Sequence, residues 1–319
     1  MSDSHRTIRV GTRGSLLART QTEWVLDRLR AEHPSLRFEA VIIRTTGDIR
    51  TQDGPARFAG KGFFTKEIED ALLADSIDLA VHSLKDLPIE WPQGLALGAV
   101  PVREDPRDAL VGGTCEHLHA AGRTVRIGTS SLRRGAQLRR AFPGCSVVNL
   151  RGNLDTRLQK VRDGAVDCAV LAAAGLRRLG RQQEISDFFT LEQMLPAPGQ
   201  GALAMEIRAG DERLRELLAP VHCALTATAV EAERAFMSAL GGGCTLPVAA
   251  LATVEDGILR LRGRVLSLDG DRCLDSQAEG PAAAPGDVGR AAAAQLLARG
   301  AADIIRMVER ELQGSIPLS

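Results

Sequence analysis

Residues 125–141 read VRIGTSSLRRGAQLRRA, and this stretch indicates the fold more clearly than any other part of the chain. Val125 to Gly128 has the apolar and β-branched residues of a short strand, and Leu132 to Ala141 has the spacing of a helix. Three hydroxyl residues separate the two elements. A strand that leads directly into a helix is the building unit of an α/β fold.

The same alternation of strands and helices extends over the first two hundred residues. Further strands are expected at Ile8 to Thr12, Phe38 to Arg44, Leu79 to His82, Val147 to Leu150 and Cys168 to Leu171, and further helices at Ser15 to His33, Thr65 to Ala74 and Leu154 to Arg162. This order predicts largely parallel or mixed sheets with helices on both faces.

The pattern changes near Ala224. A long helix is expected from there to about Leu240, followed by β segments at 248–253, 258–266 and 272–276 and by alanine-rich helices. The dipeptides Asp256-Gly257 and Asp269-Gly270 are typical of hairpin turns. This part of the chain is therefore predicted to be a smaller α+β domain.

Two segments rich in turn residues, 101–106 and 195–201, are expected to cross between two α/β domains. The expected division is 1–101 with 201–219 as α/β domain 1, 102–200 as α/β domain 2, and 220–319 as α+β domain 3. Paired crossings favour a hinge with a ligand cleft between the lobes. A chain of 319 residues is long enough for several domains, since single cores stop growing at about 250 to 300 residues.

The composition excludes some classes of protein. Basic and acidic residues number 40 each and aromatic residues make up 3%, whereas nucleic-acid-binding proteins usually carry basic patches and stacking aromatics. The six cysteines are scattered without a CxxC pair, so we expect no metal site. We find no apolar leader and no run of about 18 apolar residues. We therefore expect a cytoplasmic protein that binds neither nucleic acid nor membranes.

Arginine and hydroxyl residues recur where a strand passes into a helix. The three junctions are Gly11 to Ser15, Gly128 to Arg134 and Leu150 to Arg157. Helix N-termini offer free backbone N–H groups, and guanidinium groups bind carboxylates and phosphates in a fork. A single junction of this kind is equally typical of a capped surface helix. Three together predict a site for several carboxylates or phosphates, which this pattern does not distinguish.

Three further features are candidate site elements. Ser83, Lys85 and Asp86 follow a predicted strand, where α/β folds place catalytic groups, although a surface ion pair is the alternative. Lys61 lies in an irregular segment that resembles a mobile loop, with a solvated linker as the alternative. Cys244 follows three glycines, which favours an accessible thiol over the commoner buried structural cysteine.

Taken together, these motifs resemble the porphobilinogen deaminase family. The matching elements include Thr12 to Ser15 with Gln21, Gly60 to Gly62, His82 to Pro88, Arg103 to Asp108, Gly128 to Arg134, Leu150 to Arg157, Leu171 to Gly175, Pro198 to Gly201 and Gly242 to Cys244. The resemblance implies two α/β lobes like those of type II solute-binding proteins, joined by a hinge, and a small α+β third domain.

The resemblance also implies an activity. Enzymes of this family join four porphobilinogen molecules head to tail, release ammonia, and hydrolyse off the linear tetrapyrrole hydroxymethylbilane, in haem and porphyrin biosynthesis. A dipyrromethane primer, attached through a thioether to the residue that matches Cys244, carries the growing chain. A monomeric transferase is implied, with possible hand-over of the product to the next enzyme of the pathway.

The resemblance assigns roles residue by residue. Asp86 matches the catalytic carboxylate, which stabilises cationic pyrrole intermediates and moves protons. The cofactor-binding set is Cys244, Ser83, Lys85, Asp86, Thr129, Ser130, Ser131, Arg133 and Arg134. The substrate-binding set is Arg13, Ser15, Gln21, Lys61, Arg151, Arg157 and Gln200. The arginines would pair with acetate and propionate groups, of which the product has eight.

Some positions differ from the common family pattern. These are Leu16, Ala59, Pro198 and Thr245-Leu246, and none of them removes a reactive group. Ala59 and Pro198 are expected to affect loop and hinge motion. A solute-binding or sensor protein is the alternative for the two lobes, but it leaves Cys244 unexplained. Nucleic-acid binding through the arginines is a further alternative, which predicts a contiguous basic face.

Overall fold

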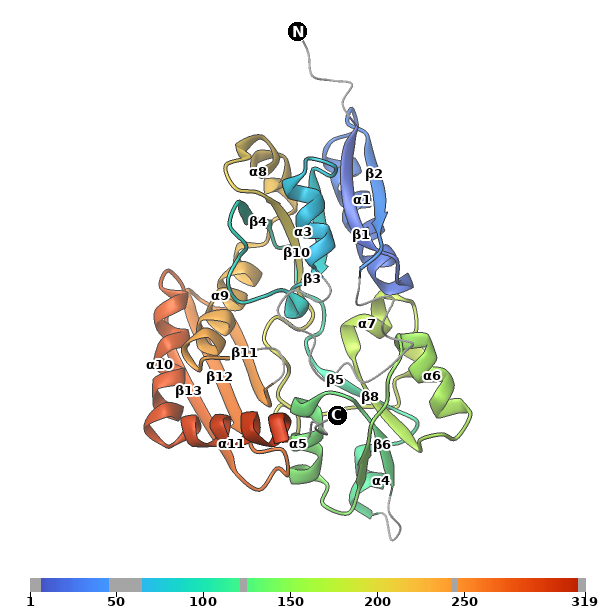
Figure 1. Ribbon diagram of the computed structural model, residues 1–319, viewed down its shortest axis with the longest axis vertical. Helices are drawn as coiled ribbons and strands as arrows, with labels where there is room; N and C mark the ends of the chain where they lie inside the picture. Colours follow the sequence, from blue (N-terminus) through green and yellow to red (C-terminus); the bar gives the residue numbers. More distant parts are fainter. Residues whose placement is uncertain (1–6, 46–64, 121–124, 243–245, 315–319) are drawn as a thin grey trace. The chain divides into compact units, whose positions relative to one another are not determined.

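The computed structural model describes residues 7–45, 65–120, 125–242 and 246–314. The chain divides into two compact units (Figure 1). The first combines Met1–Glu104 with Gly201–Ala227, and the second combines Asp105–Gln200 with Thr228–Ser319. The finer division into three domains with the boundaries given above stays a prediction.

The first unit is built on a five-stranded sheet in the order β2-β1-β3-β10-β4. Its strands are β1 (Ile8–Arg13), β2 (Phe38–Ile43), β3 (Leu79–Ser83), β4 (Leu95–Ala99) and β10 (Leu203–Arg208). Strand β1 runs parallel to β2 and β3, whereas β10 lies between β3 and β4 and runs antiparallel to both. The sheet is therefore mixed, and its inserted strand comes from the returning chain.

Helices cover both faces of this sheet. They are α1 (Leu16–Glu32), α3 (Lys66–Leu73) and α8 (Glu212–Leu218), with the short 3-10 turns η1 (Leu84–Asp86) and η3 (Ala219–Val221). Successive side chains of a strand point to opposite faces. Accordingly, Leu79 and Val81 belong to a core with Leu26 of α1, whereas Ala80 belongs to a core with Ile68 of α3.

The second unit contains a five-stranded sheet of the same plan, in the order β7-β6-β8-β5-β9. Its strands are β5 (Asp108–Val111), β6 (Arg126–Gly128), β7 (Ser146–Val148), β8 (Cys168–Ala172) and β9 (Asp187–Phe188). Strand β6 is parallel to β7 and β8, and β5 is antiparallel to β8 and β9. The accompanying helices are α4 (Cys115–Ala120), α5 (Leu132–Ala141), α6 (Leu154–Arg162) and α7 (Ala173–Arg178), with η2 (Gln182–Glu184).

The second unit also holds a three-stranded antiparallel sheet in the order β11-β12-β13. It consists of β11 (Val248–Glu255), β12 (Ile258–Leu266) and β13 (Cys273–Pro281), with most of α9 (Ala224–Ala239), which begins at the end of the first unit, and with α10 (Pro285–Ala298) and α11 (Ala301–Gly314). The hairpin at Asp256-Gly257 is confirmed, and both residues have positive φ, 50° and 75°. The β segments and helices predicted for this part of the chain are therefore present as an α+β arrangement.

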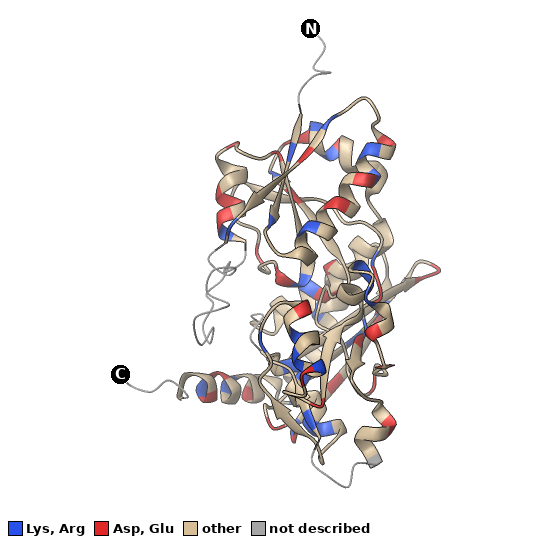
Figure 2. Cartoon of the chain, turned by 90° about the vertical axis from the view of Figure 1, so that its right-hand side faces the viewer, with Lys and Arg blue, Asp and Glu red and all other residues tan. Residues whose placement is uncertain are grey.

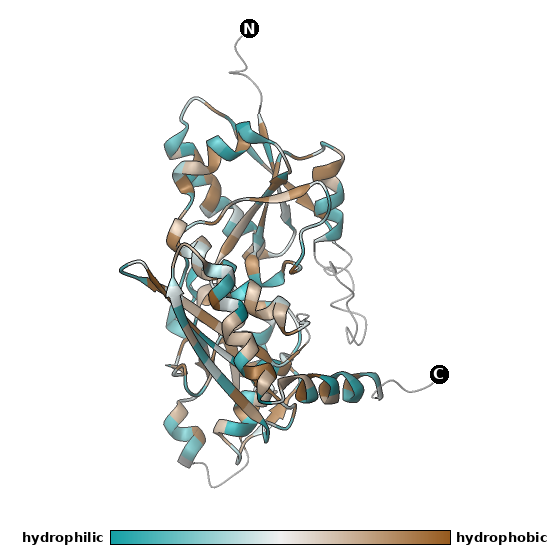
Figure 3. Ribbon diagram, turned by 90° about the vertical axis from the view of Figure 1, so that its left-hand side faces the viewer, coloured by the Kyte–Doolittle hydropathy of each residue, from teal (hydrophilic) through white to brown (hydrophobic). Residues whose placement is uncertain are grey.

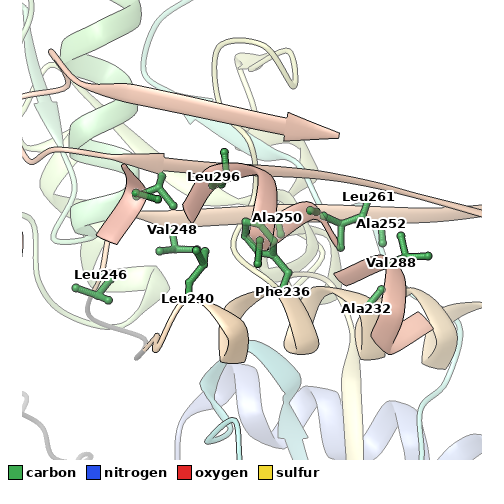
Figure 4. Close-up of a cluster of buried hydrophobic side chains, with 14 of the residues drawn as sticks. Ala232, Phe236, Leu240, Leu246, Val248, Ala250, Ala252, Leu261, Val288 and Leu296 are labelled. Carbon is green, nitrogen blue, oxygen red and sulfur yellow. The ribbon is translucent and has the colours of Figure 1, made fainter. Parts of the chain in front are cut away.

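This small sheet has its own core, shown in Figure 4, which is formed with α9, α10 and α11. Phe236 of α9 is fully buried and lies against Gly263 of β12, where a Cβ would be only 2.4 Å from the ring. Gly263 of β12 therefore makes room for the aromatic ring.

Helix α11 alternates between hydrophobic and hydrophilic residues in Figure 3, and Ile304 and Val308 on its apolar side are buried.

One predicted strand differs from the structure in an informative way. The sequence favours a strand from Val147 to Leu150, but β7 ends at Val148. Leu150 instead packs over Gly128, where a Cβ would lie 2.6 Å from the leucine side chain. Leu150 is therefore buried beyond the end of β7, in the segment that leads into α6.

Candidate active site

In the first unit, predicted site residues lie where β1 ends and α1 begins. Arg13 is the last residue of β1 and is half-buried. Ser15 is the N-cap of α1, and its Oγ accepts a hydrogen bond from the Ala18 N–H at 3.2 Å. A capping hydroxyl keeps its own O–H donor, so Ser15 can cap the helix and still donate to a bound anion.

The carboxyl end of β3 brings a second group of predicted residues to the same edge of the sheet, because β3 runs parallel to β1. Ser83 Oγ donates to Gln21 Oε1 at 3.2 Å, which links β3 to the first turns of α1. Gln21 is buried and Ser83 half-buried. The Oγ of Ser83 is thus oriented by the buried Gln21 side chain rather than by solvent.

The 3-10 turn η1 presents Lys85 and Asp86 outward. Leu84 and Leu87 are both buried, and residues three apart lie on one side of a 3-10 turn. The Leu84 N–H donates to Ala202 O of the returning chain at 3.0 Å. The turn is therefore anchored on its leucine side, leaving Lys85 half-buried and Asp86 exposed.

Two buried acidic residues near the start of this turn, Glu206 and Glu69, carry no signal in the sequence and lie close to His82 of β3. His82 Nε2 is 2.9 Å from Glu206 Oε2, and both side chains are buried. Burial raises the pKa of Glu69 on α3, and the negative charge of Glu206 adds to the rise. The end of β3 therefore carries buried titratable groups beside the exposed residues of the turn.

In the second unit, the junction of β6 and α5 is a hydroxyl-rich cap. Ser131 is the N-cap of α5 and accepts from the Arg134 N–H at 3.4 Å, while its own N–H donates to Thr129 Oγ1 at 3.2 Å. Thr129 is buried, Ser131 half-buried and Ser130 exposed. The N-terminal turn of α5 thus combines backbone N–H groups and hydroxyls, as an anion site requires.

Arg133 and Arg134 are buried at this helix start and share one carboxylate, Asp108. Arg133 Nη1 donates to Asp108 Oδ2 at 2.8 Å, and Arg134 Nε and Nη2 donate to Oδ1 at 3.0 and 2.7 Å. Burial by itself would raise the pKa of Asp108, but the two guanidinium groups outweigh it and hold that pKa well below its usual range. The carboxylate is therefore fully ionised.

Arg157, on α6, adds a third guanidinium group to this region. Its Nε donates to Gly152 O at 2.9 Å, and no acidic side chain pairs with it among the residues that the structure describes. Burial lowers the pKa of Arg157 to about 10, and the positive charge of Arg134 contributes. Gly152 has φ 114°, and a Cβ there would lie 2.7 Å from Thr156, so only glycine fits the turn.

The remaining predicted residues have varied positions. Arg151 is half-buried, and its carbonyl accepts from Lys160 Nζ at 3.1 Å. Gln200 is buried, and its Nε2 donates to Pro106 O at 2.8 Å and to Asp108 Oδ1 at 2.9 Å. Lys61 and Cys244 lie outside the described residues.

The electrostatic consequence is a local surplus of positive charge. Figure 2 shows acidic and basic residues over both units, in line with the net charge of zero. In contrast, Asp108 is the only acidic side chain that pairs with Arg133 or Arg134 in the described ranges, and Arg157 adds a further charge. An uncompensated buried charge is costly, so this arrangement suits an anionic ligand that supplies the missing negative charges.

Other kinds of site receive no support from the described residues. Within those ranges, no three His, Cys, Asp or Glu side chains gather closely enough to hold a metal ion. None of the helices described is both long enough and apolar enough to cross a membrane. The five cysteines among the described residues are free thiols.

The fold and the site together define an α/β protein with a site for a ligand that carries several negative charges. Two family models match the chain: "Porphobilinogen deaminase, dipyromethane cofactor binding domain" over residues 8–216 and "Porphobilinogen deaminase, C-terminal domain" over residues 227–298. The chain belongs to the porphobilinogen deaminase family. It is thus an enzyme of tetrapyrrole biosynthesis, with a dipyrromethane cofactor binding domain.

Relatives of high identity agree with this assignment. The chain is 47% identical over 302 residues to porphobilinogen deaminase of Syntrophus aciditrophicus, with 95% of this chain and 99% of the relative covered. It is 48% identical over 304 residues to that of Moorella thermoacetica, covering 95% and 97%. Among solved structures, an ancestral cationic amino acid solute binding protein is 15% identical, with TM-score 0.41, over 67% of this chain and 87% of that chain.

The dipyrromethane group fits the residues present. It carries four carboxylates, two from each pyrrole unit, and the arginines around Asp108 lack the matching negative charge.

The two α/β sheets share the plan expected for type II solute-binding-protein-like lobes, and the α+β part follows them in sequence. The expected fold class is therefore confirmed.

Proposed function

We propose that this chain joins four porphobilinogen molecules head to tail with release of ammonia, and then hydrolyses off hydroxymethylbilane. The reaction class is that of a transferase. The primer is dipyrromethane, held by Cys244 through a thioether. The observation that supports this proposal most strongly is the surplus of buried guanidinium charge in the second unit, where Arg133 and Arg134 share a single carboxylate.

The proposed residues divide into three groups. The primer is held by Cys244 and contacted by Ser83, Lys85, Asp86, Thr129, Ser130, Ser131, Arg133 and Arg134. The substrate is bound by Arg13, Ser15, Gln21, Lys61, Arg151, Arg157 and Gln200. Asp86 is the catalytic residue. The placement of Ser15 and Ser131 as helix caps supports these roles, because each hydroxyl keeps a donor for a ligand carboxylate.

The primer, when bound, would supply the nucleophilic pyrrole carbon for the first addition, and each added unit would then supply it for the next. The arginines bind the acetate and propionate groups, which orients the reacting carbons. The Asp86 carboxylate takes the proton that the attacking pyrrole carbon loses and stabilises positive charge on the neighbouring ring. Its exposed position on an anchored turn supports this role, because the carboxylate can approach a ligand without rearranging the backbone.

Intact mass under denaturing conditions tests the proposal. The parent protein should carry an added mass equal to two porphobilinogen units joined with loss of ammonia, and Cys244→Ser should not. Cys273→Ser is the matched control, since Cys273 is half-buried and free in the second unit, and it should keep the added mass.

A parent protein that stays unmodified after incubation with porphobilinogen or preformed hydroxymethylbilane would contradict the proposal. That result would favour a solute-binding or sensor protein, which uses the same α/β lobes without covalent chemistry.

The setting of the enzyme is also proposed. We place it in the cytoplasm as a monomer that binds neither nucleic acid nor membranes and hands its product to the next enzyme of the pathway. Light scattering coupled to size-exclusion chromatography measures the oligomeric state. The three-domain division, 1–101 with 201–219, 102–200 and 220–319, is proposed as well, and limited proteolysis at the crossings tests it.

A further inference from the structure

Asp108 is the central residue of the buried polar network in the second unit. It is the first residue of β5 and is fully buried. Its carboxylate accepts four hydrogen bonds, one at Oδ2 from Arg133 and three at Oδ1 from Arg134 and Gln200. A buried carboxylate with this many charge-assisted bonds holds its partners in one geometry.

Arg133 and Arg134 differ in how many of their nitrogens donate hydrogen bonds within the protein. Arg134 also donates from Nη1 to Val170 O at 3.1 Å, so all three of its nitrogens have protein acceptors. Arg133 uses Nη1 alone, for Asp108 and for Leu195 O at 2.6 Å. Within the described part of the chain, Nε and Nη2 of Arg133 make no hydrogen bonds. Asp108 thus fixes one end of the Arg133 fork and leaves the other available.

Asp108 also acts on the charge of the network. It neutralises one of two adjacent guanidinium groups and leaves a net positive charge in a buried place. Burial lowers the pKa of Arg133, and Asp108 offsets part of that effect. An arginine that must meet a ligand carboxylate therefore stays protonated and stays oriented.

We propose that Asp108 is a positioning residue for carboxylate recognition, which orients Arg133 and Arg134 for the primer without touching the primer itself. This inference rests on the proposed function, and deepens it, because it presumes that these arginines bind the primer carboxylates. The full burial of Asp108 and its four hydrogen bonds within the protein support it. With four donors around its two oxygens, Asp108 is occupied within the protein, and its effect on a ligand passes through the arginines.

The test compares Asp108→Asn with Asp275→Asn in the full chain. Asp275 is the matched control because it pairs with another buried arginine of the same unit, Arg264, at 2.6 and 3.1 Å. Both variants leave a buried arginine without its carboxylate. The readouts are the fraction of protein that carries the primer, by intact mass, the melting temperature, and KM and kcat for porphobilinogen.

We expect both variants to melt at lower temperature, but only Asp108→Asn to lose primer. A hydrogen bond to a charged group contributes about 1.5 to 3 kcal/mol, which corresponds to a change of about tenfold or more in loading or KM. In the protein that does load, KM should rise more than kcat falls. Loading and KM that match those of Asp275→Asn would overturn the inference.

Asp108→Glu keeps the experiment decisive if the asparagine variant does not fold. It retains the charge but moves the carboxylate by one methylene, so a positioning role predicts reduced loading, whereas a role through charge alone predicts normal loading. Failure of the proposed function would look different. In that case the parent itself would lack the primer, whereas failure of this inference leaves the parent loaded and the Asp108 variants loaded equally well.

Discussion

The contact between Phe236 and Gly263 predicts that two destabilising substitutions will compensate each other. A Cβ at Gly263 would lie 2.4 Å from the ring atoms Cε2 and Cζ of Phe236. Gly263→Ala alone should therefore overpack the core, at a cost of about 1 to 3 kcal/mol. Phe236→Leu alone removes three carbon atoms from the core, which costs about 2.4 kcal/mol at about 0.8 kcal/mol for each buried carbon.

In the double variant, the ring atoms that clash with the alanine are absent, and the new methyl group fills part of the space they leave. We expect the double variant to be more stable than the sum of the single effects by about 1 to 2 kcal/mol, within the range usual for residues in contact. Because Gly263 does not have a positive φ, alanine meets no backbone strain there.

Amide hydrogen exchange of β12 measures this coupling locally, as the free energy of opening of the small sheet. A global unfolding curve is less suitable, since a chain with several units need not unfold in one step. Effects that add within about 0.5 kcal/mol would refute the reasoning, because residues without contact show that behaviour.

Three further predictions concern a helix cap, a buried acid and the catalytic turn. Asn153→Ala should destabilise α6 by about 1 kcal/mol in hydrogen exchange, because the cap accepts from the Thr156 N–H at 2.8 Å, whereas Asn153→Asp should not. Glu69→Gln should raise the melting temperature at pH 8 but leave it nearly unchanged at pH 4. The raised pKa of Glu69 means that its favourable neutral form is lost as pH rises, and glutamine stays neutral. Asp86→Asn should lower kcat by about a hundredfold or more in primer-loaded protein, whereas Glu90→Gln, on an exposed neighbour, should retain full activity in the same assay.

The sequence predicted the parts of the fold that depend on local patterns. Helices α5 and α6 have the expected bounds, because a capping residue, Ser131 or Asn153, directly precedes each apolar pattern. Strand β10 was not predicted. Its residues, LAMEIR, include a buried glutamate, Glu206, that breaks the apolar run, and this glutamate pairs with His82 on the neighbouring strand.

The sequence predicted the site residues that lie at strand-to-helix junctions. It did not predict those whose role depends on partners far away in the sequence. Asp108 lay in a motif that the sequence analysis quoted, but its role depends on Arg133, 25 positions away, and on Gln200, 92 positions away. The sequence carries no local signal for these pairings. The same holds for Glu69, whose pKa is raised by burial and further by the negative charge of Glu206 on strand β10.

The position of β10 has a consequence for how the chain folds as it is made. The first unit's sheet needs β10 between β3 and β4, yet β10 begins at Leu203, about a hundred residues after β4 ends. At about 5 to 20 residues per second, a ribosome needs about 5 to 20 seconds to make that stretch. During this time the edges of β3 and β4 that will bind β10 are unpaired, and unpaired strand edges are prone to aggregation. The sheet of the first unit can therefore be completed only after the ribosome has made all five strands of the α/β sheet in the second unit.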